Sequence, residues 1–427
     1  MKSAPGALIA ALLAVTPVLA QTPYEATPPP ESGAGLCPRG VCGPAALQGF
    51  FEALAAHEAG QRTRAVHILQ IGDSHTAGDR ITGKVRAELQ NRFGRGGRGV
   101  LPPGVPYAGY TPFQVAVASD GWVTELAPLQ PPAGAPSPRV GLSGVRSTGS
   151  GEAVMGFELE PGAEADRVGI CGRPRGPGPG LAVEADGVVR AMDFHGGPAD
   201  AEVCREMWLA RAVSEVRLRP LGDGVTIGSV RLERTGPGLV VSNLGRVGAT
   251  LRDLAARDEA TLGVELATWR PELIVLAYGT NEGFDDGLDP AAYEALLRGQ
   301  LTRLRRLAPW ASLMILGAPD GQRSGTSGGC SVDGQRAPPP MLAVVRDLQR
   351  RVAADMGVAF WDWHGRMGGD CSADRLALMA EPHMRGDRVH FTGAGADWIG
   401  GVLAGDLIGA YDAWRAAPYA PVAGSAD

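Results

Sequence analysis

Residues Gly72-Asp73-Ser74-His75 stand where an apolar run ends, and their types suggest nucleophilic chemistry. A serine hydroxyl is a weak nucleophile until a base takes its proton, and the usual base is a histidine oriented by a carboxylate. Near the C-terminus, Asp387 and His390 are three residues apart, so one helical turn or tight loop can bring their side chains together. The sequence therefore offers Ser74 as nucleophile, His390 as base and Asp387 as orienting acid. The alternative for Ser74 is a helix N-cap.

Two other segments, each just after an expected strand, carry hydrogen-bond donors for a developing oxyanion. Gly248 lies in residues 243–250, where a glycine lets a backbone N–H approach a substrate without a side chain in the way. Gly245 is its competitor in the same segment. Asn281 lies in residues 278–282, and its side-chain amide can donate. Gly248 and Asn281 are therefore the candidate oxyanion residues.

Short apolar runs alternate with helical patterns in two stretches of the chain, residues 46–100 and 239–415. Strands are expected near residues 65–71, 239–242, 273–277, 312–316 and 358–361, with helices between them and a last helix over 398–414. Such alternation predicts a parallel sheet with helices on both faces. Parallel sheets place ligand sites at the carboxyl ends of their strands, and Ser74 stands at one such end.

Residues 101–238 have a different character, with short alternating apolar runs punctuated by Gly and Pro. This pattern predicts an all-β domain, a sandwich, inserted into the first domain. Residues 94–99, before the insert, are expected to form a flexible turn. Four aromatic residues of the insert are expected to fill its core, with a sugar-binding surface as the alternative. They are Tyr107, Tyr110, Trp122 and Trp208.

The N-terminus has the three parts of a secretory signal over residues 1–20: Lys2, the apolar run Ala7–Val15, and small residues before a cleavage site. Residues 21–45 are expected to be a Pro/Gly-rich linker, and residues 416–427 a flexible tail. No later run is long and apolar enough for a transmembrane anchor. We therefore expect an exported protein of the periplasm or extracellular space. The net charge of −6 over 427 residues argues against nucleic-acid binding.

Six cysteines fit an oxidising destination. Sequence alone does not fix their pairing, and we choose the nearest-neighbour set because each pair would lie inside one module. The pairs are Cys37 with Cys42, Cys171 with Cys204, and Cys330 with Cys371. No CxxC occurs and the histidines do not cluster with the cysteines, so no metal site is expected.

The four segments that carry the candidate site residues resemble, in their order along the chain, the conserved blocks of the SGNH (GDSL-like) hydrolase superfamily. Gly72-Asp73-Ser74 resembles the nucleophile block, and Gly248, Asn281 and the pair Asp387 and His390 match the later blocks. The resemblance implies a flavodoxin-like three-layer α/β/α domain and ester hydrolysis without a metal or other cofactor. It also implies that Ser74 attacks, while the N–H groups of Ser74 and Gly248 and the Asn281 side chain hold the oxyanion. Asp73 and His75 are expected to position the site residues rather than to react with the substrate.

The segment Asp73–Asp79 and the β insert look most like the exported peptidoglycan O-acetylesterases, in which the insert resembles a carbohydrate-binding module. The resemblance implies an acetylesterase whose partner is an O-acetylated polysaccharide, peptidoglycan first. Two rivals stay open. The same residues could serve an SGNH esterase or an O-acetyltransferase that acts on another polysaccharide or a small ester, the transferase moving acetyl onto a sugar. Alternatively, the chain could be a non-catalytic carbohydrate-binding protein.

Overall fold

The computed structural model describes residues 37, 40–129, 139–176, 178, 180–194, 201–222, 224–325, 329–331 and 334–417. The expected signal peptide (1–20), most of the expected linker (21–45) and nearly all of the expected tail (416–427) lie outside the described residues. In the described part of the chain, no helix combines the length and apolar character needed to cross a bilayer.

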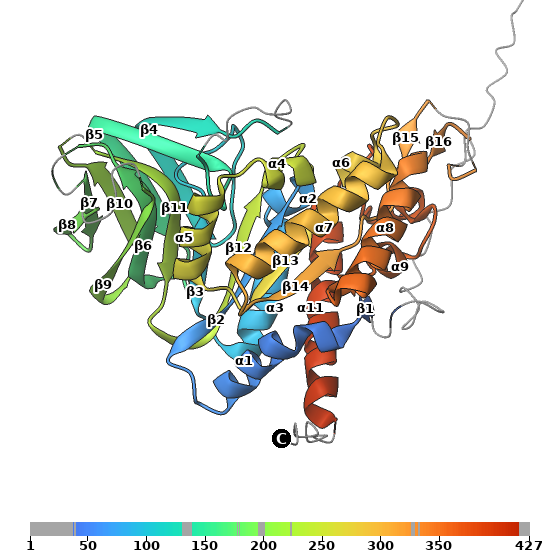
Figure 1. Cartoon of the computed structure of the whole chain (residues 1–427), viewed down its shortest axis with the longest axis horizontal. Coiled ribbons are helices and arrows are strands. Elements are labelled where there is room, and N and C mark those ends of the chain that lie inside the picture. Colours follow the sequence, from blue (N-terminus) through green and yellow to red (C-terminus); the bar gives the residue numbers. More distant parts are fainter. Residues whose placement is uncertain are drawn as a thin grey trace, which may run out of the picture.

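A six-stranded sheet forms the centre of the α/β part (Figure 1). Its order is β1-β17-β14-β13-β2-β12, all parallel except the edge strand β1. The bounds are β1 (Val41–Cys42), β2 (Arg64–Gly72), β12 (Gly236–Gly245), β13 (Leu273–Ala277), β14 (Ser312–Leu316) and β17 (Ala359–Trp361). Taken in chain order, the five parallel strands run 2-1-3-4-5, which is the flavodoxin-like order. The expected parallel sheet is confirmed.

Helices cover both faces of this sheet, because alternate strand residues point to opposite sides. On β2, Val66 and Ile68 join one apolar core, while Leu69 and Ile71 join the other. The first core packs under α1 (Gln48–Glu58), α3 (Arg80–Phe93) and α11 (Gly393–Ala416). The second packs under α5 (Glu259–Trp269), α7 (Pro290–Leu307) and α8 (Pro340–Met356). Shorter helices are η2 (Pro44–Leu47), α2 (Ser74–Ala77), α4 (Leu251–Ala255), α6 (Thr280–Gly283), α9 (Trp363–Met367) and α10 (Ser372–Ala377).

The inserted region is a nine-stranded antiparallel sheet beside β12 (Figure 1). Its strands are β3 (Gly97–Leu101), β4 (Val115–Leu126), β5 (Val145–Leu159), β6 (Ala165–Pro174), β7 (Gly180–Ala185), β8 (Val188–Asp193), β9 (Val203–Val213), β10 (Glu215–Pro220) and β11 (Val225–Glu233). The long strand β5 joins two arms, since it pairs with β11 near its start and with β10 near its end. Side chains of both arms fill one core, as the layers of a sandwich do. A separate two-stranded ribbon joins β15 (Arg323–Ser324) to β16 (Arg336–Ala337).

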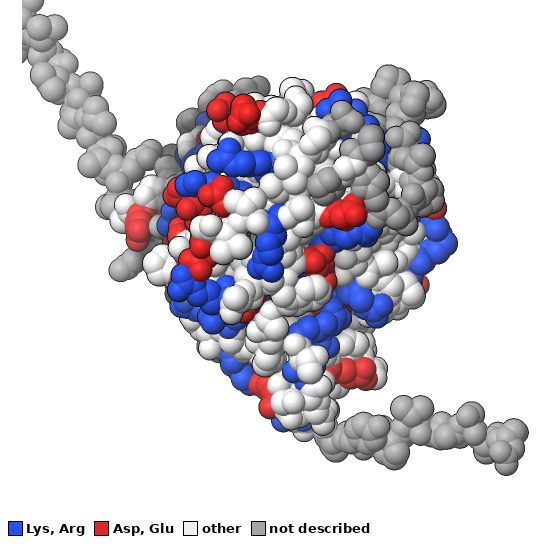
Figure 2. All heavy atoms as spheres, turned by 90° about the vertical axis from the view of Figure 1, so that its left-hand side faces the viewer, with Lys and Arg blue, Asp and Glu red and all other residues white. Residues whose placement is uncertain are grey.

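Charged side chains of both signs are interspersed over the outer face of the insert, which Figure 2 turns toward the viewer. Among the described residues of this face, neither sign of charge forms one continuous patch.

Two expectations need correction: the linker over residues 21–45 and the flexible turn over residues 94–99. Residues 41–45 are not linker, because Val41 and Cys42 add β1 to the edge of the main sheet and Val41 is buried in its core. Residues 94–99 are not only a turn, because Gly97 begins β3, which pairs with β11. In both cases long-range strand pairing decides the structure. The structure forms disulfides between Cys37 and Cys42, Cys171 and Cys204, and Cys330 and Cys371.

Candidate active site

Ser74 lies directly after β2, at the first residue of α2. The Asp73 carboxylate caps this short helix by accepting the N–H of His75 at 2.9 Å. Gly72 precedes them because a Cβ there would meet the Ala277 carbonyl oxygen at 2.5 Å. The chain can therefore turn from strand to helix at this point only with a glycine, and the turn leaves Ser74 half-buried at the carboxyl edge of the sheet.

The loop before α11 brings a histidine and an aspartate to Ser74. His390 Nε2 lies 3.0 Å from Ser74 Oγ, and His390 Nδ1 lies 2.8 Å from Asp387 Oδ2. Burial raises the pKa of Asp387, but hydrogen bonds from His390 and Val389 outweigh it, so the pKa stays below its ordinary value. A charged carboxylate can only accept, so Nδ1 carries the ring proton and Nε2 is free to accept the Ser74 hydroxyl proton.

Gly248 and Asn281 come to the same edge from the two strands that flank β2. Gly248 follows β12 with φ +75°, in the left-handed region that favours glycine. Asn281 lies in α6, after β13, and its Nδ2 donates to the Ala249 carbonyl at 2.8 Å. This bond uses one N–H of the amide and leaves the second for a substrate. The N–H of Ser74 is a third donor in reach of this edge, because the first N–H groups of a helix have no partner within it.

Gly245, the competitor of Gly248, has a packing role. A Cβ on Gly245 would collide with the Ala77 backbone nitrogen, so the end of β12 could not lie against α2. Around Gly248, by contrast, the first neighbour of an added Cβ is Leu129 Cδ1 at 3.4 Å. The space beside the Gly248 backbone is therefore the more open of the two.

Glu282, which the sequence analysis missed, connects the two candidate oxyanion segments. Its buried carboxylate accepts the N–H of Leu251 at 2.7 Å and the N–H of Gly279 at 3.0 Å. Burial raises its pKa to about 7, against the two N–H donors, which lower it. Leu251 follows Gly248 by three residues, so Glu282 holds the Gly248 loop against the Asn281 turn. Its place next to Asn281 is the one sequence signal that could have pointed to it.

His75 lies behind the serine and contacts the loop that carries His390. Its Nε2 lies 2.9 Å from the Val389 carbonyl oxygen, which can only accept, so Nε2 is protonated. Its Nδ1 lies 3.3 Å from Asp73 Oδ1. Burial lowers the pKa of His75, but the contacts with Asp73 and Val389 raise it more, and the net shift is upward. His75, the residue after Ser74, therefore connects the start of α2 to Val389, the residue before His390.

With this geometry established, similarity to known proteins becomes informative. Residues 223–398 match the model of the GDSL-like lipase/acylhydrolase family. A solved structure of a peptidoglycan O-acetylesterase is similar over 86% of this chain and 96% of its own, with 25% sequence identity and a TM-score of 0.72. The chain has the fold of an SGNH hydrolase domain, and part of it matches the GDSL-like family. It is an esterase, with an additional sheet-rich region that follows the serine segment and whose last strand, β11, lies at the start of the family match.

Other solved structures are similar to smaller parts of this chain. A GDSL-like lipase from Parabacteroides merdae ATCC 43184 is 18% identical, covers 41% of this chain and 73% of its own, and has a TM-score of 0.30. The acetyl xylan esterase AlAXEase is 18% identical, covers 39% of this chain and 79% of its own, and has a TM-score of 0.29. No curated protein matches the sequence.

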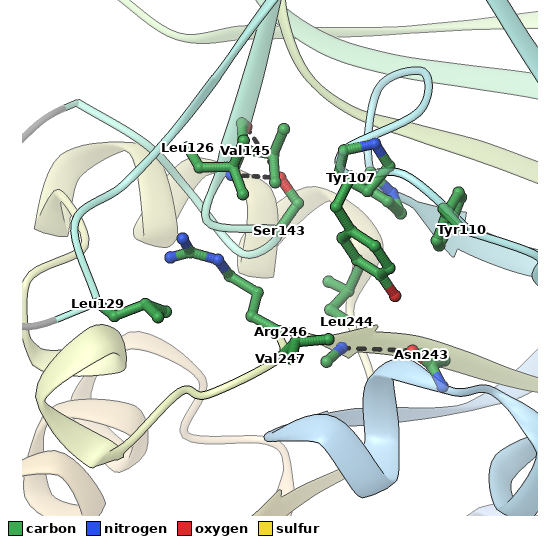
Figure 3. A pocket seen from close by; sticks show the side chains of 13 residues that line it. Tyr107, Tyr110, Leu126, Leu129, Ser143, Val145, Asn243, Leu244, Arg246 and Val247 are labelled. Carbon is green, nitrogen blue, oxygen red and sulfur yellow. Dashed lines mark hydrogen bonds between the residues drawn. The ribbon is translucent and has the colours of Figure 1, made fainter.

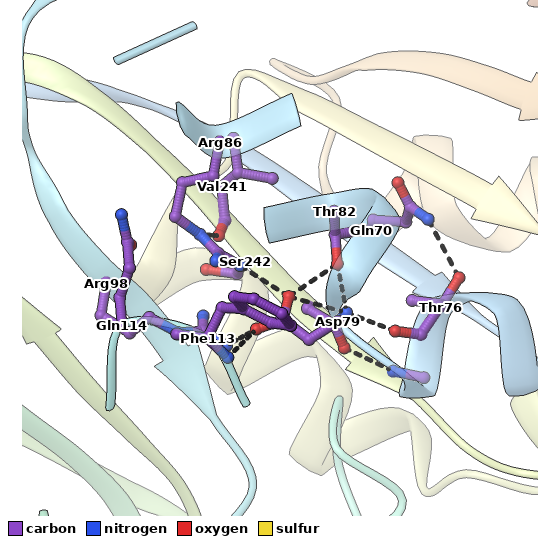
Figure 4. Close-up of polar contacts among 12 residues, drawn as sticks. Gln70, Thr76, Asp79, Thr82, Arg86, Arg98, Phe113, Gln114, Val241 and Ser242 are labelled. Atoms are coloured by element: carbon purple, nitrogen blue, oxygen red, sulfur yellow. Dashed lines mark hydrogen bonds and ion pairs between the residues drawn. The ribbon is translucent and has the colours of Figure 1, made fainter. Parts of the chain in front are cut away.

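A buried carboxylate, Asp79, lies between α2 and α3, directly before the first residue of α3 (Figure 4). Asp79 forms ion pairs with Arg86 at 2.9 Å and with Arg98 at 2.8 Å. Burial raises the pKa of Asp79, but these two cations outweigh it and hold the pKa below its ordinary value. Its other donors are Thr82 Oγ1, the Phe113 N–H and Asn243 Nδ2. Helix α3, the insert and β12 thus meet at this one carboxylate.

The four aromatic residues of the insert divide between core and surface. Trp122 is buried, as expected, but Trp208 is 55% exposed and does not belong to the core. Tyr107 and Tyr110 line a pocket between the insert and the end of β12. In the part of the chain that the structure describes, no three His, Cys, Asp or Glu side chains gather where they could hold a metal ion.

Proposed function

We propose that Ser74, His390 and Asp387 form the catalytic triad of an exported serine esterase that removes O-acetyl groups from peptidoglycan. The observation that carries the proposal is the unbroken contact chain from Ser74 Oγ through His390 to Asp387, at 3.0 and 2.8 Å. The similarity to a peptidoglycan O-acetylesterase along 86% of the chain supports the substrate. The three disulfides are compatible with an oxidising compartment outside the cytoplasm.

The reaction has two steps. Ser74 Oγ attacks the ester carbonyl while His390 Nε2 takes its proton, and the negative oxygen rests on the N–H groups of Ser74 and Gly248 and the Asn281 amide. The ester C–O bond breaks, and His390 gives its proton to the departing sugar oxygen, which leaves as a hydroxyl group. The acetyl group stays on Ser74. Water, activated by His390, then releases acetate and restores the serine. Asp387 stabilises the imidazolium in both steps.

The substrate is tested with a panel of polymers. Purified protein is given equal ester concentrations of O-acetylated peptidoglycan, O-acetylated xylan and a small activated acetate ester, and acetate is measured. The proposal predicts a higher kcat/KM for peptidoglycan than for xylan. Faster release from xylan would contradict the peptidoglycan assignment while leaving the esterase in place.

Replacing Asn281 with alanine should lower kcat by about 10²–10³-fold, because one oxyanion donor is lost. Steady-state kinetics on the small acetate ester measure this. Asn91→Ala, which removes an exposed asparagine of α3, is the matched control and should leave kcat unchanged. A near-normal Asn281→Ala enzyme would remove this residue from the oxyanion hole.

Replacing His75 with phenylalanine should lower kcat by about 10–100-fold, because the Val389 carbonyl loses the donor that fixes the His390 loop. His75→Gln keeps an N–H donor and should recover part of the loss. Thermal unfolding of both variants shows whether the fold is intact. If Phe and Gln variants have equal kcat, the bond to Val389 does not position the triad.

A further inference from the structure

A pocket lies between the insert and the loop that carries Gly248 (Figure 3). One wall is the end of β12 and the residues after it, up to Val247, which directly precedes Gly248. The other wall comes from the insert, with Tyr107, Leu126 and Leu129. Neither part of the chain forms this pocket alone. It therefore exists only because the insert packs beside the catalytic domain, next to a proposed oxyanion residue.

Two hydroxyl groups of the pocket lining donate hydrogen bonds within the protein. The Tyr107 hydroxyl donates to the Ala77 carbonyl at 3.1 Å, and Ser143 Oγ donates to the Gly228 carbonyl at 2.7 Å. The Arg246 guanidinium is paired with Asp253, a carboxylate that also pairs with Arg257, and it donates to the Ala127 carbonyl. What the pocket offers a ligand is therefore hydrocarbon and aromatic surface. The C–H surface of a ligand would be buried favourably against this lining.

The rim of the pocket exposes apolar side chains to solvent. Leu126 is 45% exposed and Val247 is 57% exposed, and they stand on opposite walls. Exposed apolar surface on both sides of a hollow beside a reactive site is typical of a ligand groove. Tyr107 and Tyr110 stand against each other, with ring centroids 5.5 Å apart, which holds the aromatic part of the wall in place.

We propose that this pocket binds the C–H face of a sugar that neighbours the acetylated sugar in the glycan chain. The inference rests on the proposed function and names a subsite of it. A sugar ring presents C–H groups on its faces and hydroxyls at its edge, which matches an apolar hollow with a solvent-exposed rim. The position beside Gly248 places the neighbouring ring within a short distance of the ester. The insert thereby contributes to polymer recognition rather than to the chemical step.

The test is Leu126→Ser, with Val123→Ser as its matched control. Val123 is on the same strand and is 66% exposed, but it does not line the pocket. kcat/KM is measured on O-acetylated peptidoglycan and on the small acetate ester. Leu126→Ser should lower kcat/KM on the polymer by about tenfold and leave the small ester unchanged, because one apolar contact is worth about that factor. Val123→Ser should change neither value.

Three results would overturn the subsite. Equal losses on polymer and small ester would mean that Leu126 supports the catalytic centre. No loss on the polymer would mean that the pocket does not touch it. A loss confined to activated esters with longer acyl chains would make the pocket an acyl site. If the wild type prefers another acetylated polysaccharide, kcat/KM of Leu126→Ser and of the wild type is compared on that polymer instead. If the wild type cleaves no acetylated polysaccharide, the proposed function and this subsite both fail.

Discussion

Replacing His390 with alanine is expected to lower kcat on a small acetate ester by about 10⁵–10⁶-fold. In the structure, His390 Nε2 lies 3.0 Å from Ser74 Oγ and faces it as the acceptor of its proton. Without the imidazole, the serine stays protonated and the leaving alkoxide receives no proton. Activity that remains should come from the oxyanion donors and from binding.

His383 supplies the control for this variant. It lies seven residues earlier, with its Nδ1 2.9 Å from the Glu381 carbonyl and its ring against Trp398. His383→Ala should keep kcat within a few-fold of the wild type, whereas His390→Ala should be nearly inactive. If His383→Ala were the inactive variant, or if both were active, His390 would not be the base.

Replacing Asp387 with asparagine is expected to lower kcat by about 10⁴-fold. Asp387 Oδ1 accepts the N–H groups of Val389 and His390, at 2.9 and 3.0 Å, while Oδ2 faces the His390 ring. Because both backbone donors need an oxygen, the new amide nitrogen must face the ring. It then donates to Nδ1, which moves the ring proton to Nε2, and Nε2 can no longer accept the proton of Ser74.

The loss in Asp387→Asn is measured as kcat on the small ester, together with thermal unfolding. Asp397→Asn is a suitable control, because Asp397 is a partly exposed carboxylate of α11 that pairs with Arg80. We expect the control to lose little activity, since exposed ion pairs contribute little. Equal, small effects in both variants would mean that Asp387 does not set the tautomer of His390.

Much of the sheet and the candidate site could be predicted from the sequence, because both depend on local signals. Ser74, Gly248 and Asn281 each follow an apolar run, and such runs become adjacent parallel strands whose ends meet at one edge. Asp387 and His390 are three residues apart, so their contact needs only a tight loop. Because ligand sites of parallel sheets lie at the carboxyl ends of the strands, all of these residues could be expected at one edge of the sheet.

Other parts depended on partners far along the chain and could not be predicted. Arg98 stands in a glycine-rich segment that indicates a turn, yet it is fully buried against Asp79. Val41 becomes an edge strand because Trp361 lies opposite it. Glu282 gains its role from the N–H of Leu251, which is distant in sequence. The pocket beside Gly248 requires the packing of the whole insert, which no local pattern specifies.

The measurement that tests the central claim most directly is acetate release from O-acetylated peptidoglycan by the wild type and by Ser74→Ala. The account predicts steady release by the wild type and none above background by the variant, with both proteins unfolding at similar temperatures. Release by Ser74→Ala at the rate of the wild type would contradict Ser74 as nucleophile. No release by the wild type, while it still cleaves a small acetate ester, would contradict peptidoglycan as the substrate.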